Sequence, residues 1–268
     1  MKKVVLLMVA ILVALPLTSC KKELPQNDLT NQEVDQSTSL EGNDLALAEV
    51  DAEDDIPDAK YRYITAYSGL SLREHANLQS NRLAKMPYGS RVKLIEVEAD
   101  RTMTVSGIAG GMDRVEFDHR SGYAFNGYLS RYFPPEQDIT VSGYAKDLQK
   151  VFPEVTYVSK NGGTVSKPTL TETITLPGAL WHEAFFIGQR LYEFPREFEF
   201  PLPAGKDFEL IKDNKPKRDL WVSQMEITRK NDQLSKIEYI YSSAKYNNRI
   251  SIVEKDGAMV ITRTEVTN

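Results

Sequence analysis

Residues 221–266 read WVSQMEITRKNDQLSKIEYIYSSAKYNNRISIVEKDGAMVITRTEV, and this stretch decides the fold class. Four segments within it alternate apolar and polar residues with the period of a β-strand: 221–229, 234–242, 249–255 and 259–266. The linkers between them include Asn-Asp and Asp-Gly pairs, which favour hairpin turns. We therefore predict an antiparallel four-stranded meander in this part of the chain.

Two amphipathic helices are predicted ahead of these strands, one in residues 142–152 (SGYAKDLQKVF) and one in residues 178–194 (GALWHEAFFIGQRLYEF). A proline follows each of them and ends it. The first helix turns three apolar side chains to one face: Tyr144, Leu148 and Val151. The second has a wider apolar face: Leu180, Ala184, Ile187 and Leu191, flanked by Trp181, Phe185, Gly188 and Tyr192. Its opposite face is polar: His182, Gln189, Arg190 and Glu193.

Further strands are predicted between the two helices, in EVTYVS and TLTETITL, on either side of a KNGG turn. Packing of both helices on one face of the meander is the economical arrangement for these elements. We therefore predict an α+β domain over residues 138–268. This half resembles no family that we recognise.

A second unit is predicted over residues 61–133, because the two prolines of RYFPPEQD (131–138) interrupt the chain. The segments YRYITAY, RVKLIEVEA, DRVEFD and SGYAF have strand character, and MPYGS and AGGMD are turn signals. Five or so short strands with little helix indicate a small β-barrel closed on itself.

Three blocks of this unit resemble the bacterial SH3 domain family: SGLSLRE (68–74), MPYGSRVKLIE (86–96) and DRVEFDHRSGYAFNGYLS (113–130). The chain departs from the family pattern at Met112, where a tryptophan is common, and in the longer segment DRTMTVSGIAGG. The resemblance implies an SH3-like barrel that binds peptides or cell-wall peptidoglycan rather than one that performs chemistry. The positions that match its shallow groove are Tyr67, Arg73, Tyr88, Tyr123, Asn126 and Tyr128. Core or rim packing is the competing interpretation for each aromatic residue.

The beginning of the chain predicts export. Two lysines precede an apolar run from Val4 to Leu17, which fits a secretory signal and is too short to cross a bilayer comfortably. Leu17-Thr18-Ser19-Cys20 resembles the lipobox of bacterial lipoproteins, in which cleavage precedes an acylated cysteine. We therefore predict a signal peptide over residues 1–19 and lipidation of Cys20. Two or more acyl chains give stable membrane anchoring, whereas one is marginal.

Residues 20–60 are predicted to form a flexible tether. Residues 21–60 contain twelve Asp or Glu against three Lys and no aromatic residue, a composition that cannot order itself. Because the whole chain has a net charge of −5, about +2 remains for residues 61–268, which gives no indication of nucleic-acid binding. Localisation is expected to be extracytoplasmic, and Lys21 after the cysteine favours the outer membrane over inner-membrane retention.

The sequence contains few candidate catalytic residues. His75, His119 and His182 are the only histidines, and no two have metal-ligand spacing, so no metal or cofactor is predicted. The single thiol is assigned to lipid, which excludes a cysteine peptidase. One S-x-x-K match, Ser242 to Lys245, lies in a predicted turn without its companion motifs. His182 is expected to be solvated, with a site shared with Glu183 or Glu193 as the alternative.

The leading hypothesis is therefore a non-enzymatic envelope lipoprotein whose SH3-like module binds peptidoglycan or a protein or peptide partner. One alternative is an envelope hydrolase with a carboxylate or serine site in residues 138–268, for which a deep pocket near His182 would be the sign. A second alternative is an adhesin or an inhibitor of a secreted factor.

Overall fold

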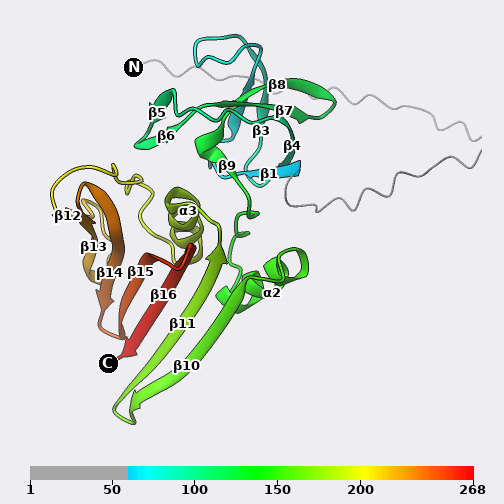
Figure 1. Ribbon diagram of the computed structural model, residues 1–268. Coiled ribbons are helices and arrows are strands. Elements are labelled where there is room, and N and C mark those ends of the chain that lie inside the picture. Colours follow the sequence, from blue (N-terminus) through cyan, green and yellow to red (C-terminus); the bar gives the residue numbers. More distant parts are fainter. Residues whose placement is uncertain (1–59) are drawn as a thin grey trace, which may run out of the picture. The chain divides into compact units, whose positions relative to one another are not determined.

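Antiparallel β-structure dominates residues 60–268, which are the residues that the computed structural model describes (Figure 1). Strands account for 51% and helices for 12% of them. The prediction of a mainly β chain with two amphipathic helices is confirmed. The predicted signal peptide, Cys20 and the tether up to residue 59 lie outside the described residues.

The first sheet has seven strands in the order β3-β2-β8-β7-β4-β1-β9. Their bounds are β1 Tyr61–Ile64, β2 Leu70–Arg73, β3 Arg82–Met86, β4 Arg91–Glu96, β7 Met112–Phe117, β8 Arg120–Phe125 and β9 Leu129–Ser130. A 3-10 turn, Asn126–Tyr128, connects β8 to β9. The strand order ends in two edge strands, β3 and β9, so the closure of the barrel expected from the sequence is not observed.

A separate two-stranded hairpin, β5 (Met103–Val105) and β6 (Ile108–Gly110), occupies the long segment between β4 and β7. Its turn consists of Ser106 and Gly107, with φ values of 48° and 82°. Positive φ at both central residues is the geometry of a type I′ turn, which matches the twist of the flanking strands. The extra length that separates this chain from the SH3 pattern thus forms a hairpin of its own.

The second sheet also has seven strands, in the order β10-β11-β16-β15-β14-β13-β12. The bounds are β10 Thr156–Thr164, β11 Lys167–Pro177, β12 Phe208–Lys212, β13 Leu220–Lys230, β14 Gln233–Ser243, β15 Tyr246–Lys255 and β16 Ala258–Thr267. Each of β13 to β16 pairs with the next in antiparallel register. The sheet is larger than the four strands expected, because β10 and β11 join β16 and because β12, which was not predicted, joins β13.

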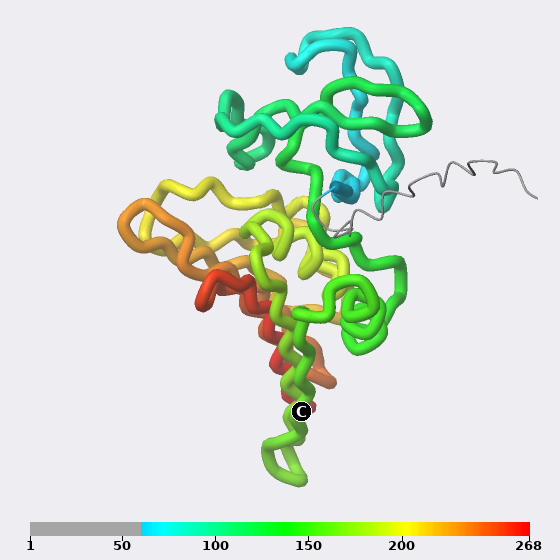
Figure 2. Tube along the Cα trace, turned by 45° about the vertical axis from the view of Figure 1, so that its right-hand side comes forward, coloured from blue at the N-terminus to red at the C-terminus, as the bar shows by residue number. Residues whose placement is uncertain are grey.

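One row of side chains shows why these strands align. Five fully buried isoleucines lie side by side across five neighbouring strands: Ile174, Ile261, Ile252, Ile237 and Ile227. A slip of one residue in any strand would turn its isoleucine to the opposite face, so burial of the row fixes the register. The predicted KNGG turn is wrong, because Gly162 and Gly163 continue β10 and the β10–β11 hairpin extends beyond its neighbours (Figures 1 and 2).

The two helices are α2 (Val141–Val151) and α3 (Trp181–Leu191), close to the ranges predicted from the sequence. Helix α3 packs on β15 and β16, and α2 lies against β10 and β11 (Figure 1). The predicted faces need three corrections. Val151, predicted on the apolar face of the first helix, is 45% exposed. Leu180 is 51% exposed, whereas Gln189 is buried and donates to the carbonyl oxygens of Pro195 and Phe198 at 3.1 and 3.0 Å.

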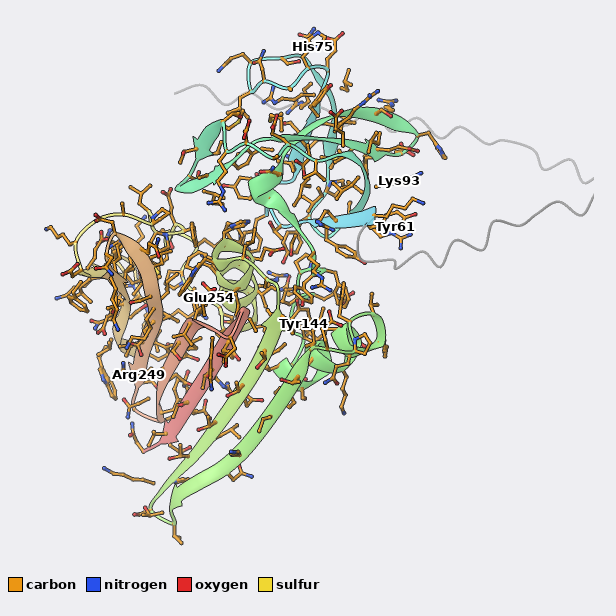
Figure 3. The ribbon with its side chains drawn as sticks, in the orientation of Figure 1. Tyr61, His75, Lys93, Tyr144, Arg249 and Glu254 are labelled. Carbon is orange, nitrogen blue, oxygen red and sulfur yellow. The ribbon has the colours of Figure 1, made fainter. Side chains whose placement is uncertain are left out.

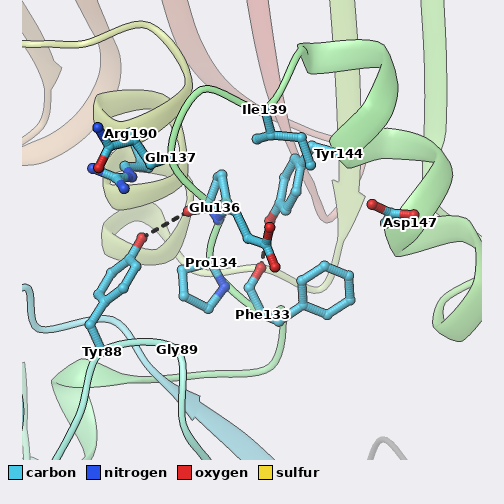
Figure 4. Close-up of a pocket in the computed structure, with 11 residues that line it drawn as sticks. Tyr88, Gly89, Phe133, Pro134, Glu136, Gln137, Ile139, Tyr144, Asp147 and Arg190 are labelled. Atoms are coloured by element: carbon cyan, nitrogen blue, oxygen red, sulfur yellow. Dashed lines mark hydrogen bonds between the residues drawn. The ribbon is translucent and has the colours of Figure 1, made fainter.

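Aromatic side chains fill the connection between the sheets. Tyr144 of α2 is fully buried, and its hydroxyl donates to the Phe133 carbonyl at 2.7 Å (Figures 3 and 4). The Tyr132 ring packs edge-on against Phe152 at 4.8 Å. The buried side chains of both sheets belong to one continuous hydrophobic cluster. The two sheets therefore share one hydrophobic core, which supports the surfaces to which both contribute.

Candidate binding groove and a cavity around His182

A groove of about 470 Å³ runs between the first sheet and the α3 region. Tyr67, Arg73 and Tyr128 line it from the first sheet, and Phe186 and Arg196 line it from the second half of the chain. The structure thus brings three of the six predicted ligand-binding residues into one concave surface.

Tyr67 belongs to a column of aromatic and cationic groups at one end of this groove. Its ring stacks on Tyr88 at 5.1 Å, with an angle of 11° between the planes. The Arg196 guanidinium lies 5.7 Å from the Tyr67 ring centre, and that of Arg190 lies 5.9 Å from both rings. Burial raises the pKa of the Tyr67 hydroxyl, and the two guanidinium groups oppose this shift. Both tyrosines are therefore neutral donors at physiological pH.

Tyr88 is held in place by stacking on Tyr67 and by one hydrogen bond. Its hydroxyl donates to the Pro135 carbonyl at 3.3 Å, beside Arg190 (Figure 4). Burial raises the pKa of this hydroxyl. Tyr88 lines a different hollow, next to the proline connector, and is absent from the lining of the groove that Tyr67 lines.

Tyr128 forms part of the groove and also helps to hold α3. Its ring meets Phe125 edge-on at 5.9 Å and lies 5.7 Å from the ring of Phe186 on α3. Its backbone carbonyl accepts hydrogen bonds from both the N–H and the hydroxyl of Thr65, at 3.0 and 3.2 Å. The residue therefore has a fixed position in the groove.

The remaining predicted residues serve different purposes. Arg73 lines the groove, and its Nη1 donates to the Ser80 carbonyl at 2.7 Å. Tyr123 pairs with Arg73 across β8 and β2 but is absent from the groove lining. Asn126 lies outside the groove, where its amide donates to Asp113 Oδ1 at 3.0 Å and accepts from the Gly111 N–H at 2.9 Å. Asn126 therefore holds Asp113 and the Gly111 backbone in place and does not line the groove.

Sequence reasoning missed the residues that the second half of the chain adds to the groove: Phe186, Gln189, Arg196, Phe198, Glu199 and Phe200. Phe186 lies on a helix whose apolar periodicity was recognised, so its burial against another surface could have been anticipated. Arg196 follows Pro195 in a segment without periodicity, and no signal in the sequence indicates its position beside Tyr67.

His182 is not solvated as expected. It lines a cavity of about 700 Å³, and its Nε2 is buried without a hydrogen-bond partner among residues 60–268. Its ring lies edge-on to Phe200 at 6.0 Å. Burial, aided by the nearby Arg101 guanidinium, lowers the pKa of His182 to about 4. The imidazole is therefore neutral at physiological pH.

The carboxylates proposed as partners of His182 have other functions. Glu183 accepts hydrogen bonds from the backbone N–H groups of Arg131 and Leu180, each at 2.7 Å, and so caps α3. Glu193 is paired with Lys217. Within the S-x-x-K match, Ser243, which follows the serine of the motif, accepts from the N–H groups of Lys245 and Tyr246 at 3.2 and 3.3 Å and thus forms part of a turn.

Residues 60–268 contain neither a cluster suited to a metal ion nor a helix suited to cross a membrane. Within residues 60–268, no group of three or more His, Cys, Asp or Glu side chains could hold a metal ion. None of the described helices is both long enough and apolar enough to span a bilayer. Comparison of the chain with protein-family models, with curated proteins and with solved structures gave no significant match.

Proposed function

We propose that this protein is a non-enzymatic lipoprotein of the bacterial envelope, anchored through Cys20, that binds peptidoglycan or a protein or peptide partner. Residues 61–133 act as an SH3-like module in spite of their open sheet. Residues 138–268 complete the binding surface. The acidic tether holds this surface away from the anionic membrane.

The groove is the observation that supports this proposal. Tyr128 and Phe186 supply aromatic surface in this hollow. Its charged groups are the guanidinium groups of Arg73 and Arg196 and one carboxylate, that of Glu199. Aromatic rings contribute large contact areas at low entropic cost, and guanidinium groups bind carboxylates in a bidentate manner. The combination fits an extended peptide that carries a carboxylate, as peptidoglycan stem peptides and protein segments do.

A sedimentation assay with purified peptidoglycan tests the proposal. Residues 21–268 should sediment with peptidoglycan at physiological salt, and Arg196→Ala should weaken retention about tenfold through loss of one charge-assisted contact. Arg114→Ala is the matched control, because Arg114 is exposed on β7 of the same sheet and outside the groove.

Two results would count against this assignment. Equal retention of the two arginine variants would show that the groove is not the binding surface. If wild type is not retained, and an array of acidic peptides also fails to bind it, the binding function itself is wrong.

The anchor has an independent test. Cys20→Ala should abolish incorporation of labelled palmitate and should move the protein from the membrane fraction to the soluble fraction. Palmitate labelling of the variant at the wild-type level would contradict the anchor and leave the groove proposal intact.

One observation favours the hydrolase as a second candidate, namely the cavity in which neutral His182 lies with the carboxylates of Asp113 and Glu254. A neutral imidazole can accept a proton from a nucleophilic water. Release of soluble fragments from peptidoglycan by the wild type, and its loss in His182→Phe, would establish this alternative. Intact peptidoglycan after prolonged incubation would support the binding function.

A further inference from the structure

The cavity around His182 is separate from the groove. Helix α3 contributes Trp181 and His182 at its first turn, and Glu254 comes from β15 (Figure 3). Phe200 lines both hollows and lies between the β5–β6 hairpin and α3. A volume of about 700 Å³ is within the range of sites for small organic ligands.

At one wall of the cavity, the backbone of two glycines lies so close to neighbouring atoms that a side chain would not fit at either position. A Cβ atom at Gly107 would lie 2.6 Å from the Phe200 carbonyl oxygen, and one at Gly110 would lie 2.4 Å from Asn126 Oδ1. Asp113 on the adjoining strand is held by the Glu98 N–H at 2.9 Å and by the Asn126 amide at 3.0 Å. The polar groups of this wall are therefore fixed in place.

His182 has no evident structural task. Buried polar atoms are nearly always hydrogen-bonded, and an unpaired one costs about 1–3 kcal/mol. Nε2 of His182 nevertheless lacks a partner within the described part of the chain. The residue also lines the cavity, so the rest of its imidazole ring can contact a ligand there.

The charges around the cavity indicate the chemistry of that ligand. Four carboxylates line it (Glu98, Asp100, Asp113 and Glu254), together with two guanidinium groups (Arg62 and Arg101). The excess of acidic groups disfavours an anion. Acidic and basic groups both line the cavity, and Arg62 lies near enough to Asp113 to act on it electrostatically. A hydroxyl group both donates and accepts hydrogen bonds, so it can pair with carboxylates and guanidinium groups alike.

We propose that this cavity is a binding site for a neutral, hydroxyl-rich saccharide of one or two rings, with Trp181 as its aromatic surface and His182 as a polar contact. The aromatic face of Trp181 packs on the apolar face of a sugar ring. Carboxylates and guanidinium groups bind the hydroxyls at its edge. The site is independent of the groove and of the lipid anchor.

Calorimetric titration of residues 21–268 tests this site with four probes: cellobiose, the disaccharide of N-acetylglucosamine, the dipeptide Ala-Ala as a zwitterion, and inorganic phosphate as an anion. At least one disaccharide should bind, and neither Ala-Ala nor phosphate should compete with it. Trp181→Ala should weaken binding about tenfold through loss of ring stacking.

His182→Phe separates a ligand role from a structural role. It should leave the melting temperature at neutral pH equal or higher, because Nε2 has no hydrogen bond to lose within residues 60–268, and it should still weaken saccharide binding about tenfold. Arg114→Ala, at an exposed position of β7 outside the cavity, should bind the disaccharide as wild type does. The inference is overturned if neither disaccharide binds, if Ala-Ala or phosphate binds instead, or if both cavity variants retain wild-type affinity.

Discussion

The carboxylate of Glu183 accepts a hydrogen bond from the backbone N–H of Arg131 at 2.7 Å, across 52 residues of sequence. Its other oxygen accepts from the Leu180 N–H at 2.7 Å, at the start of α3. One buried side chain thus caps the helix that carries His182 and also ties it to the residue that follows β9. The position of α3 against the first sheet, which both the groove and the cavity require, depends on this contact.

Replacement of Glu183 by Ala should therefore lower the free energy of unfolding by about 3 kcal/mol, because two charge-assisted hydrogen bonds from backbone N–H groups to this buried side chain are lost. Urea denaturation measures this loss. Glu154→Ala is the matched control, since Glu154 also contacts Arg131, through Nη2 at 2.7 Å, but is partly exposed and should cost about 1 kcal/mol or less. Equal losses in the two variants would contradict the assigned role of Glu183.

His182 should make the protein sensitive to acid. Its folded pKa of about 4 lies below the ordinary value of 6.5, so the unfolded chain takes up a proton in this interval that the folded chain does not. The stability that depends on the neutral imidazole is present above about pH 6.5 and is lost as the pH falls towards 4, by up to about 3 kcal/mol. Urea midpoints at pH 7, 5.5 and 4 should show this loss in wild type.

Two variants separate the charge of His182 from its shape. His182→Phe and His182→Asn cannot be protonated in this range, so both should show a flatter dependence of stability on pH than wild type. A wild-type slope in either variant would mean that other groups cause the acid sensitivity.

Strand periodicity and turn chemistry predicted much of the second sheet, because register there follows from local pattern. The alternation around Ile227, Ile237, Ile252 and Ile261 is visible in the sequence, and the observed pairing aligns these four residues. The short strand β12 was missed because three of its five residues are exposed, among them Phe208 at 56%, so it carries little apolar pattern.

The candidate sites were harder to predict because distant segments build them. Tyr67 was proposed from the sequence as a ligand contact, but Arg196 beside it is separated by more than half of the described chain. His182 lies on the polar side of its helix by periodicity, but it is half-buried, in a cavity that residues of the β4–β5 loop, the β5–β6 hairpin and Phe200 also line. Periodicity describes one element at a time and carries no information about which loop covers it.

The hairpin turn at Gly107 should not tolerate a side chain. Gly107→Ala would place a Cβ at a φ of 82° and 2.6 Å from the Phe200 carbonyl oxygen. Gly257→Ala is the matched control, because its φ is 76° and nothing lies within 4 Å of the added carbon. Gly257→Ala should cost about 1 kcal/mol for the backbone conformation alone, and Gly107→Ala should cost at least about 2 kcal/mol more. Similar urea midpoints for the two variants would show that the hairpin can move away from Phe200 freely.

Arg229 should hold the segment that carries Leu202 and Lys206 against the second sheet. Its buried guanidinium donates to the Leu202 carbonyl through Nε and Nη2 at 3.0 and 2.9 Å, and to the Lys206 carbonyl through Nη1 at 3.0 Å. It also pairs with Glu209 at 3.0 Å. Arg229→Met would leave these acceptors unpaired and should lower the free energy of unfolding by about 3–5 kcal/mol.

The same substitution should expose residues 201–207 to proteolysis under native conditions, because their contacts to the sheet are lost. Arg249→Met provides the control, since Arg249 is 54% exposed in its pair with Glu238 and should cost about 1 kcal/mol or less. Cleavage should be mapped by mass spectrometry in wild type and in both variants. If Arg229→Met resists cleavage as wild type does and unfolds at the same urea concentration, other contacts hold this segment. The groove and the cavity, which Phe200 separates, would then be maintained without Arg229.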